Sequence, residues 1–184
     1  MYNSAKAAQI IAYLALKTEA RAINVLKAIK LVYISDREAL KRFAMPMLDE
    51  PRASLPHGPV NSWTYDNAKG EVEDANWSTI LDDRANHMIG VKADIGVDDL
   101  DELSDAEVEV LDSVWEEFGG MTQWQLSDWT HKSDNIPEWE DPNGSSNPIP
   151  LERLLHAVGI ENTVEHAQFL RDQASITKLL AELA

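Results

Sequence analysis

Apolar residues recur every three to four positions through most of the first 43 residues, which is the spacing of one face of an α-helix. Asn3 and Ser4 are suitable cap residues for a first helix, which we expect to run to about Lys17. A second, longer helix is predicted over residues 22–43. It should end before Pro46, because a residue that precedes proline avoids the helical region.

The middle of the chain has a different pattern. The proline-rich segment 48–60 predicts a loop, and residues 60–68 predict a short helix that Gly70 ends. Two short runs rich in apolar residues, 77–81 and 87–93, flank a polar segment. Two such runs around a polar turn indicate a β-hairpin.

Capping motifs mark the start of two helices in the second half of the chain. Ser104 with Glu107, and Thr122 with Gln125, have the spacing of capping boxes. Proline at position 150 suits the first turn of a later helix. The predicted helices are 104–118, 123–131, 150–158 and 163–183, and the predicted loops are 94–102 and 132–150.

These patterns predict a mainly α-helical fold: a single compact domain over residues 1–184, with about six to seven helices and one small β-hairpin. A chain of 184 residues, 44% of them hydrophobic, is large enough for one real core. The absence of cysteine excludes disulfides and thiolate metal sites, and it favours a cytoplasmic location. No apolar run reaches the length of a membrane span, so no membrane association is expected.

The charge argues against nucleic-acid binding. Thirty-two acidic residues outnumber 16 Lys and Arg residues, for a net charge of −16. The two helices around Gly119 have helix-turn-helix lengths, but residues 104–131 contain seven acids and no Lys or Arg. DNA would be repelled by such a surface. An acidic surface favours either simple solubility or a basic protein partner.

Catalytic and cofactor signatures are weak. His131 lies near Asp128 and Asp134 in sequence, which is half of a general-base arrangement. The chain has no cysteine nucleophile, no nucleophile-elbow serine, no phosphate-binding glycine motif and no metal-ligand spacing among its five histidines. We therefore predict no enzyme activity, no cofactor and no metal, and we keep an enzyme centred on His131 as an alternative.

The tryptophans allow two interpretations. Trp115, Trp124, Trp129 and Trp139 lie close together in the sequence. Large side chains of this kind either fill a core or, where exposed, anchor a protein partner.

Three segments in order, 27–43, 55–65 and 103–139, resemble the Panacea domain, also called the SocA-like antitoxin domain, which occurs in phage-associated proteins of the GepA type. The resemblance covers about residues 5–140, and the helices within 150–184 are expected to pack on that domain. The family pattern falls on Lys30, Leu31, Tyr33, Asp36, Gly58, Pro59, Val60, Leu103, Glu107, Leu126, Ser127, Thr130, His131 and Trp139.

The resemblance implies an antitoxin that neutralises a cognate toxin by direct protein–protein binding. One relative acts instead as an adaptor that delivers its toxin to an AAA+ protease, and a phage-encoded inhibitor of a host defence protein is a further alternative. Ser127, Thr130 and His131 are then expected to tie down the 132–150 loop. We expect His131 to donate to a backbone carbonyl, and Trp139 to fix the loop to the domain.

Charge suggests where a toxin would bind. A toxin that acts on RNA or nucleotides carries a basic active-site surface, which acidic side chains complement. The candidate partner-binding residues are the acids of the 94–117 region and of the following loop: Asp98, Asp99, Asp101, Glu102, Glu109, Glu116, Asp134 and Glu138.

Overall fold

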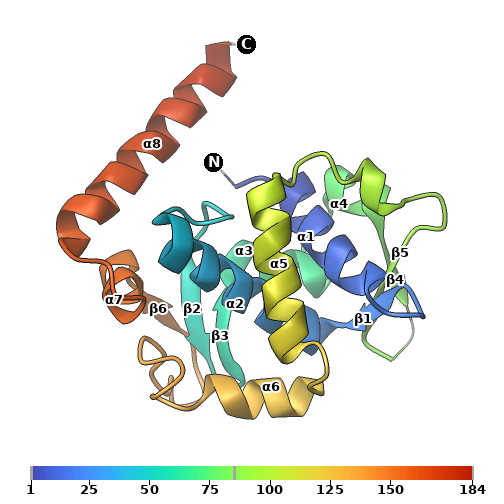
Figure 1. Ribbon diagram of the computed structural model, residues 1–184, viewed down its shortest axis with the longest axis horizontal. Coiled ribbons are helices and arrows are strands. Elements are labelled where there is room, and N and C mark those ends of the chain that lie inside the picture. The colour runs from blue at the N-terminus through green and yellow to red at the C-terminus, as the bar shows by residue number, and fades with distance from the viewer. Residues whose placement is uncertain (1, 85, 184) are drawn as a thin grey trace.

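The computed structural model describes residues 2–84 and 86–183 (Figure 1). Eight α-helices lie within these residues: α1 (Ser4–Leu16), α2 (Val25–Phe43), α3 (Ser62–Ala68), α4 (Ala75–Ile80), α5 (Asp105–Phe118), α6 (Gln123–Thr130), α7 (Leu151–Ala157) and α8 (Thr163–Leu183). A 3-10 turn, η1 (Val97–Asp99), precedes α5. The prediction of a mainly helical fold is confirmed.

Helix α2 is the centre of the main core and contacts α5, α6 and β3 (Gly58–Asn61). Its residues Leu31 and Val32 are almost completely buried, as are Ile11 of α1 and Leu111 of α5. Both capping boxes are present, at Ser104 for α5 and at Thr122 for α6. At the start of α5 the Glu107 carboxylate accepts from the Ser104 backbone N–H at 2.9 Å, so a local side chain satisfies the N–H group of the cap residue.

The fold has more β-structure than one hairpin. One antiparallel sheet has the order β1 (Ala22–Asn24), β5 (Met88–Val91), β4 (Leu81–Arg84). The predicted hairpin exists between β4 and β5, and its turn includes Ala85, which lies outside the described residues. Residues 77–81 were expected to form its first strand, yet most of them lie in α4. The reason is the Asp74 side chain, which caps α4 by accepting from the Trp77 backbone.

The second antiparallel sheet has the order β3, β2 (Arg52–Leu55), β6 (Asn147–Ile149). The predictions of loops over 48–60 and 132–150 are therefore wrong for the residues that form these strands, 52–55, 58–60 and 147–149. Pro59 and Pro148 weakened the strand signal, because proline cannot donate to a sheet ladder. Both prolines lie in edge strands that pair only with β2, where a missing N–H group on the outer side is tolerated.

The C-terminal helices pack only in part. Leu154 and Leu155 of α7, and Ala167 and Leu170 of α8, join Tyr33, Leu40 and Ile136 in a second hydrophobic cluster. The C-terminal end of α8 projects from the body of the molecule (Figure 1). The apolar side chains in the second half of this helix are 50% to 84% exposed: Ile176, Leu179, Leu180 and Leu183.

No helix in the described part of the chain is both long enough and apolar enough to cross a membrane.

Candidate functional site

A row of buried polar side chains runs along one face of α2. Lys30, Tyr33 and Asp36 follow one another at a spacing of three, so they share that face. All three are at most 1% exposed. A buried polar group is costly unless it is hydrogen-bonded, and each of the three has a partner on a different segment.

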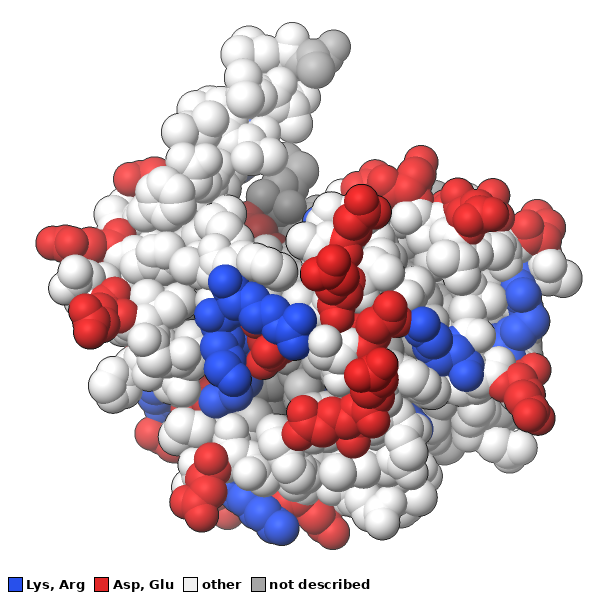
Figure 2. Space-filling view, viewed as in Figure 1, with Lys and Arg blue, Asp and Glu red and all other residues white. Residues whose placement is uncertain are grey.

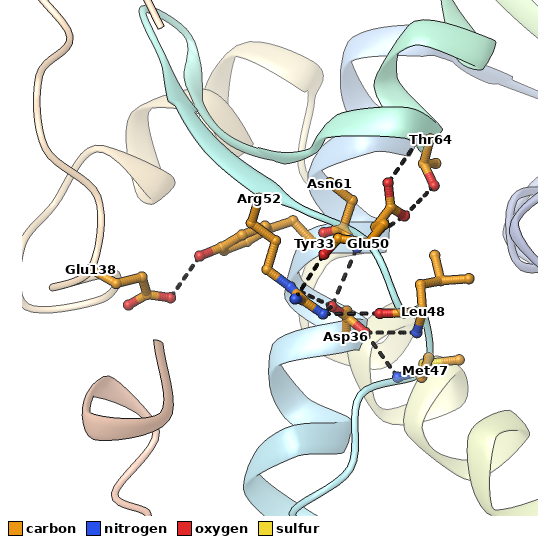
Figure 3. A network of polar contacts seen from close by, with 9 residues as sticks. All are labelled: Tyr33, Asp36, Met47, Leu48, Glu50, Arg52, Asn61, Thr64 and Glu138. Carbon is orange, nitrogen blue, oxygen red and sulfur yellow. Dashed lines mark hydrogen bonds and ion pairs between the residues drawn. The ribbon is translucent and has the colours of Figure 1, made fainter. Parts of the chain in front are cut away.

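Asp36 holds the segment that follows α2 in place through hydrogen bonds and an ion pair (Figure 3). Its Oδ2 accepts from Arg52 Nε at 2.9 Å and from Arg52 Nη2 at 2.5 Å, and its Oδ1 accepts from the backbone N–H groups of Met47 (2.8 Å) and Leu48 (3.1 Å). Burial lowers the pKa of Arg52, but the Asp36 carboxylate outweighs burial and raises it. An ion pair with two hydrogen bonds to one carboxylate oxygen thus fixes the start of β2 against α2.

Glu50 extends this network to α3 (Figure 3). Its carboxylate accepts from the Thr64 backbone N–H at 2.9 Å, from Thr64 Oγ1 at 2.6 Å and from Asn61 Nδ2 at 3.3 Å. Burial raises the pKa of Glu50, and the hydrogen bonds from Thr64 oppose that shift. Glu50, Arg52 and Asn61 were not predicted as site residues, because nothing in a proline-rich segment signals that its charges are buried.

Tyr33 holds the loop that follows α6 (Figure 3). Its hydroxyl donates to Glu138 Oε1 at 2.8 Å, and Arg37 Nε donates to the same oxygen at 2.8 Å. Burial, and then the Glu138 charge, raise the pKa of Tyr33 well above its usual value. Glu138 is completely buried, so its assignment as a partner-binding residue is corrected: it is an internal anchor of the 132–146 segment.

The turn between β2 and β3 is held through its carbonyl groups. Four of its five consecutive carbonyl oxygens, from position 55 to position 59, accept a hydrogen bond from a side chain elsewhere in the chain. The pairs are Trp139 Nε1 to Leu55 O (3.1 Å), His131 Nε2 to Pro56 O (2.9 Å), Ser127 Oγ to His57 O (3.1 Å) and Lys30 Nζ to Pro59 O (2.8 Å). We call residues 55–59 the clamped turn.

Gly58 is required within the clamped turn. Its φ is +97°, a conformation that side chains disfavour, and an added Cβ would lie 2.4 Å from Thr130 Oγ1 and 3.1 Å from Lys30 Nζ. Thr130 Oγ1 itself donates to the Ser127 carbonyl at 2.9 Å. The glycine therefore lets the turn approach both α2 and α6 closely.

His131 has a structural role in this arrangement. A carbonyl oxygen only accepts, so the ring donates through a protonated Nε2, and the expected bond to a backbone carbonyl is confirmed. The ring also packs edge-on against Trp139, with centroids 4.6 Å apart. No hydrogen bond joins His131 to Asp128 or Asp134 within the described residues, so the general-base arrangement is not formed.

At least one pattern residue from each of the three segments thus lies at this turn, namely Lys30, Gly58, Ser127, His131 and Trp139. The family model described as "Antitoxin SocA-like, Panacea domain" matches residues 29–140. The chain belongs to this family. The matched region begins one residue before Lys30 and ends one residue after Trp139, so it contains every side chain that holds the clamped turn. No curated protein and no solved structure matched the chain.

A pocket of about 460 Å³ adjoins the clamped turn of this Panacea domain. Leu55, Pro56 and His57 form one wall, and the first turns of α2 and α6 form others. Trp124, at the start of α6, is 60% exposed at this pocket, and its ring lies edge-on to that of His57. Of the tryptophans weighed as possible anchors, Trp124 is thus a surface residue, whereas Trp129 packs against Phe118 in the core.

The remaining acidic candidates lie on the surface. Acidic side chains form a band over α5 in Figure 2. Asp101 and Glu102 are partly committed to the fold, because they accept from Gln9 (2.9 Å) and Asn3 (2.8 Å). The exposed candidates are Asp98 and Asp99 on η1, Asp101 and Glu102 after it, Glu109 and Glu116 on α5, and Asp134 in the following loop. Their role in binding a partner stays a prediction.

Proposed function

We propose that this Panacea domain is the antitoxin of a toxin–antitoxin pair and neutralises its cognate toxin by binding it directly in the cytoplasm. The observation that carries the proposal is the family match over residues 29–140, together with the clamped turn built by the residues of that match. A domain held by internal hydrogen bonds presents a preformed surface, and a preformed surface loses little entropy when it binds a partner. Family membership also favours binding over catalysis.

Charge supports the acidic surface as the toxin contact. Glu107 and Asp112 of α5 are paired with Lys6 and Lys17, whereas exposed acids such as Glu109 and Glu116 line the same helix. Unpaired surface acids of one sign steer a basic partner toward the surface. A toxin that acts on RNA or nucleotides fits this surface, because its substrate site must itself be basic.

The functional test is survival. The open reading frame adjacent to this gene is induced alone and together with this chain, and colonies are counted. Killing by the neighbour with rescue by this chain supports the proposal, and absence of rescue contradicts it. Rescue that is lost in a strain without its AAA+ protease, while the two purified proteins still bind, would identify the adaptor mode instead.

The surface assignment has its own test, in a toxin-binding assay with purified proteins. Replacing Asp98, Glu109 and Glu116 together by lysine should weaken binding by at least about tenfold, because like charges would then face the toxin. The matched control replaces three exposed acids of the C-terminal helical region by lysine, and it should bind normally: Glu161, Glu165 and Asp172. Equal affinity of both triple variants would remove the acidic face as the contact.

A further inference from the structure

We propose that the pocket beside the clamped turn binds a small apolar carboxylate. The pocket has a volume of about 460 Å³, which lies in the range of small-molecule sites. Leu26, Ile29, Val60 and Tyr65 are among its lining residues, so most of a ligand buried there would touch hydrocarbon. The isolated protein would bind this ligand whether or not it is an antitoxin.

The lining of the pocket differs in composition from the acidic chain as a whole. Acidic residues outnumber basic ones by 32 to 16 overall, yet no Asp or Glu is among the described residues that line the pocket. Its lining includes Lys30 and the imidazoles of His57 and His87. A lining that contains a lysine and no carboxylate favours a ligand with negative charge.

The dipoles of two helices also contribute positive electrostatic potential at the pocket. Asn24, Val25 and Leu26 begin the 19-residue helix α2 at the pocket, and Gln123 and Trp124 begin α6 there. A helix start carries partial positive charge, and residues from two helix starts line this one cavity. Both the side chains and the backbone therefore favour an anion at the polar end of the ligand.

Lys30 is a buried cationic side chain in the lining of this pocket. It is 0% exposed and, among the described residues, donates one hydrogen bond, to Pro59 O at 2.8 Å. An ammonium group has three donors, so its charge is only partly compensated. In a low-dielectric setting, an anion in the adjoining pocket would interact strongly with that charge.

The pocket is also preformed. Leu55, Pro56 and His57 form its wall, and the carbonyl groups of all three are fixed by side chains of α6 and the following segment. The β4–β5 turn forms another part of the lining, and the His87 carbonyl accepts from the Val25 backbone at 2.8 Å. Binding then requires little ordering of the protein, which is the condition for tight binding of a small ligand.

The first experiment is an NMR titration of the full chain with labelled methyl groups and labelled indoles. The probes are 3-phenylpropionate and its uncharged amide. We expect saturable shifts at Leu26, Ile29 and Trp124 with the carboxylate, and at least about tenfold weaker binding of the amide, because charge-assisted contacts are lost. Equal affinity for both probes, or no shift at these residues, overturns the proposal.

Three variants test whether the probes bind in this pocket. Leu26→Trp fills the pocket from the second position of α2 and should abolish the shifts, while Val164→Trp, at the second position of α8, should leave them intact. The double variant His57→Gln with His87→Gln should weaken carboxylate binding and leave amide binding unchanged. Carboxylate affinity that is unaffected by these histidine changes contradicts the charge argument.

A final comparison separates two sources of the same chemistry. The tripeptide Gly-Leu-Phe is titrated as the free acid and as the C-terminal amide, beside 3-phenylpropionate. Tighter binding of the free-acid tripeptide identifies a protein C-terminus as the ligand, and tighter binding of 3-phenylpropionate identifies a free small acid. Failure of every free acid to bind refutes both.

Discussion

The stability of the protein should depend on pH through Lys30, and the Lys30→Met variant isolates that dependence. Burial lowers the pKa of Lys30 to about 7 in the folded protein. In the unfolded chain a lysine titrates near its ordinary value of about 10.4. Between these two values the unfolded chain binds more protons than the folded one, so stability rises with pH.

The magnitude follows from the two pKa values. Below pH 7 both states carry the charge and the full burial cost is present, whereas above pH 10.4 both are neutral and the cost is gone. The wild type should therefore gain about 2 kcal/mol of unfolding free energy from pH 7 to pH 9, relative to Lys30→Met. Between pH 6 and pH 7 the same difference should change by less than about 0.5 kcal/mol.

Urea unfolding at pH 6, 7, 8 and 9 measures this difference, because other titrating groups cancel between the two proteins. Lys132→Met, which removes an exposed lysine, is the control and should show no such slope. A complementary measurement on the wild type is the Lys30 side-chain NMR signal, which should titrate near pH 7. A difference in unfolding free energy between wild type and Lys30→Met that stays constant from pH 7 to pH 9 would refute the lowered pKa of Lys30.

Three further changes test the polar contacts by chemical unfolding. Gly58→Ala should destabilise the protein by about 3 kcal/mol or more, through the positive φ and the contact with Thr130. Adding Thr130→Ala should recover part of this loss of stability. No recovery would show that the contact with Thr130 does not cause the loss. Arg52→Met should lower the free energy of unfolding by roughly 3–5 kcal/mol, because it leaves Asp36 charged, buried and without its ion-pair partner. The double variant Arg52→Met with Asp36→Leu should lose clearly less stability. Equal losses in the two variants would argue against a buried charge at Asp36. Trp139→Phe removes one N–H donor to the clamped turn and should lower the free energy of unfolding by about 1 kcal/mol. An unchanged midpoint of chemical unfolding would show that this hydrogen bond does not contribute to stability.

Some features follow from short stretches of sequence. The starts of α5 and α6 were predicted from Ser104 with Glu107 and Thr122 with Gln125, because a capping box needs only residues three apart. The bond from His131 to a backbone carbonyl was expected, although the carbonyl itself, at Pro56, lies 75 residues away. The family was also identified from the order of three short segments.

Other features were decided only by the tertiary structure. Strand β2 became a strand because Arg52 pairs with Asn61 and also with Ile149, which lies almost a hundred residues later in the chain. Glu138 looks like a surface acid in its polar loop, yet it is buried because Tyr33 and Arg37 lie opposite to it in the fold. Local sequence determines caps and helical periodicity, since those depend on near neighbours. Strand pairing, the burial of charges and the pocket depend on contacts between distant segments, and only the folded chain brings these together.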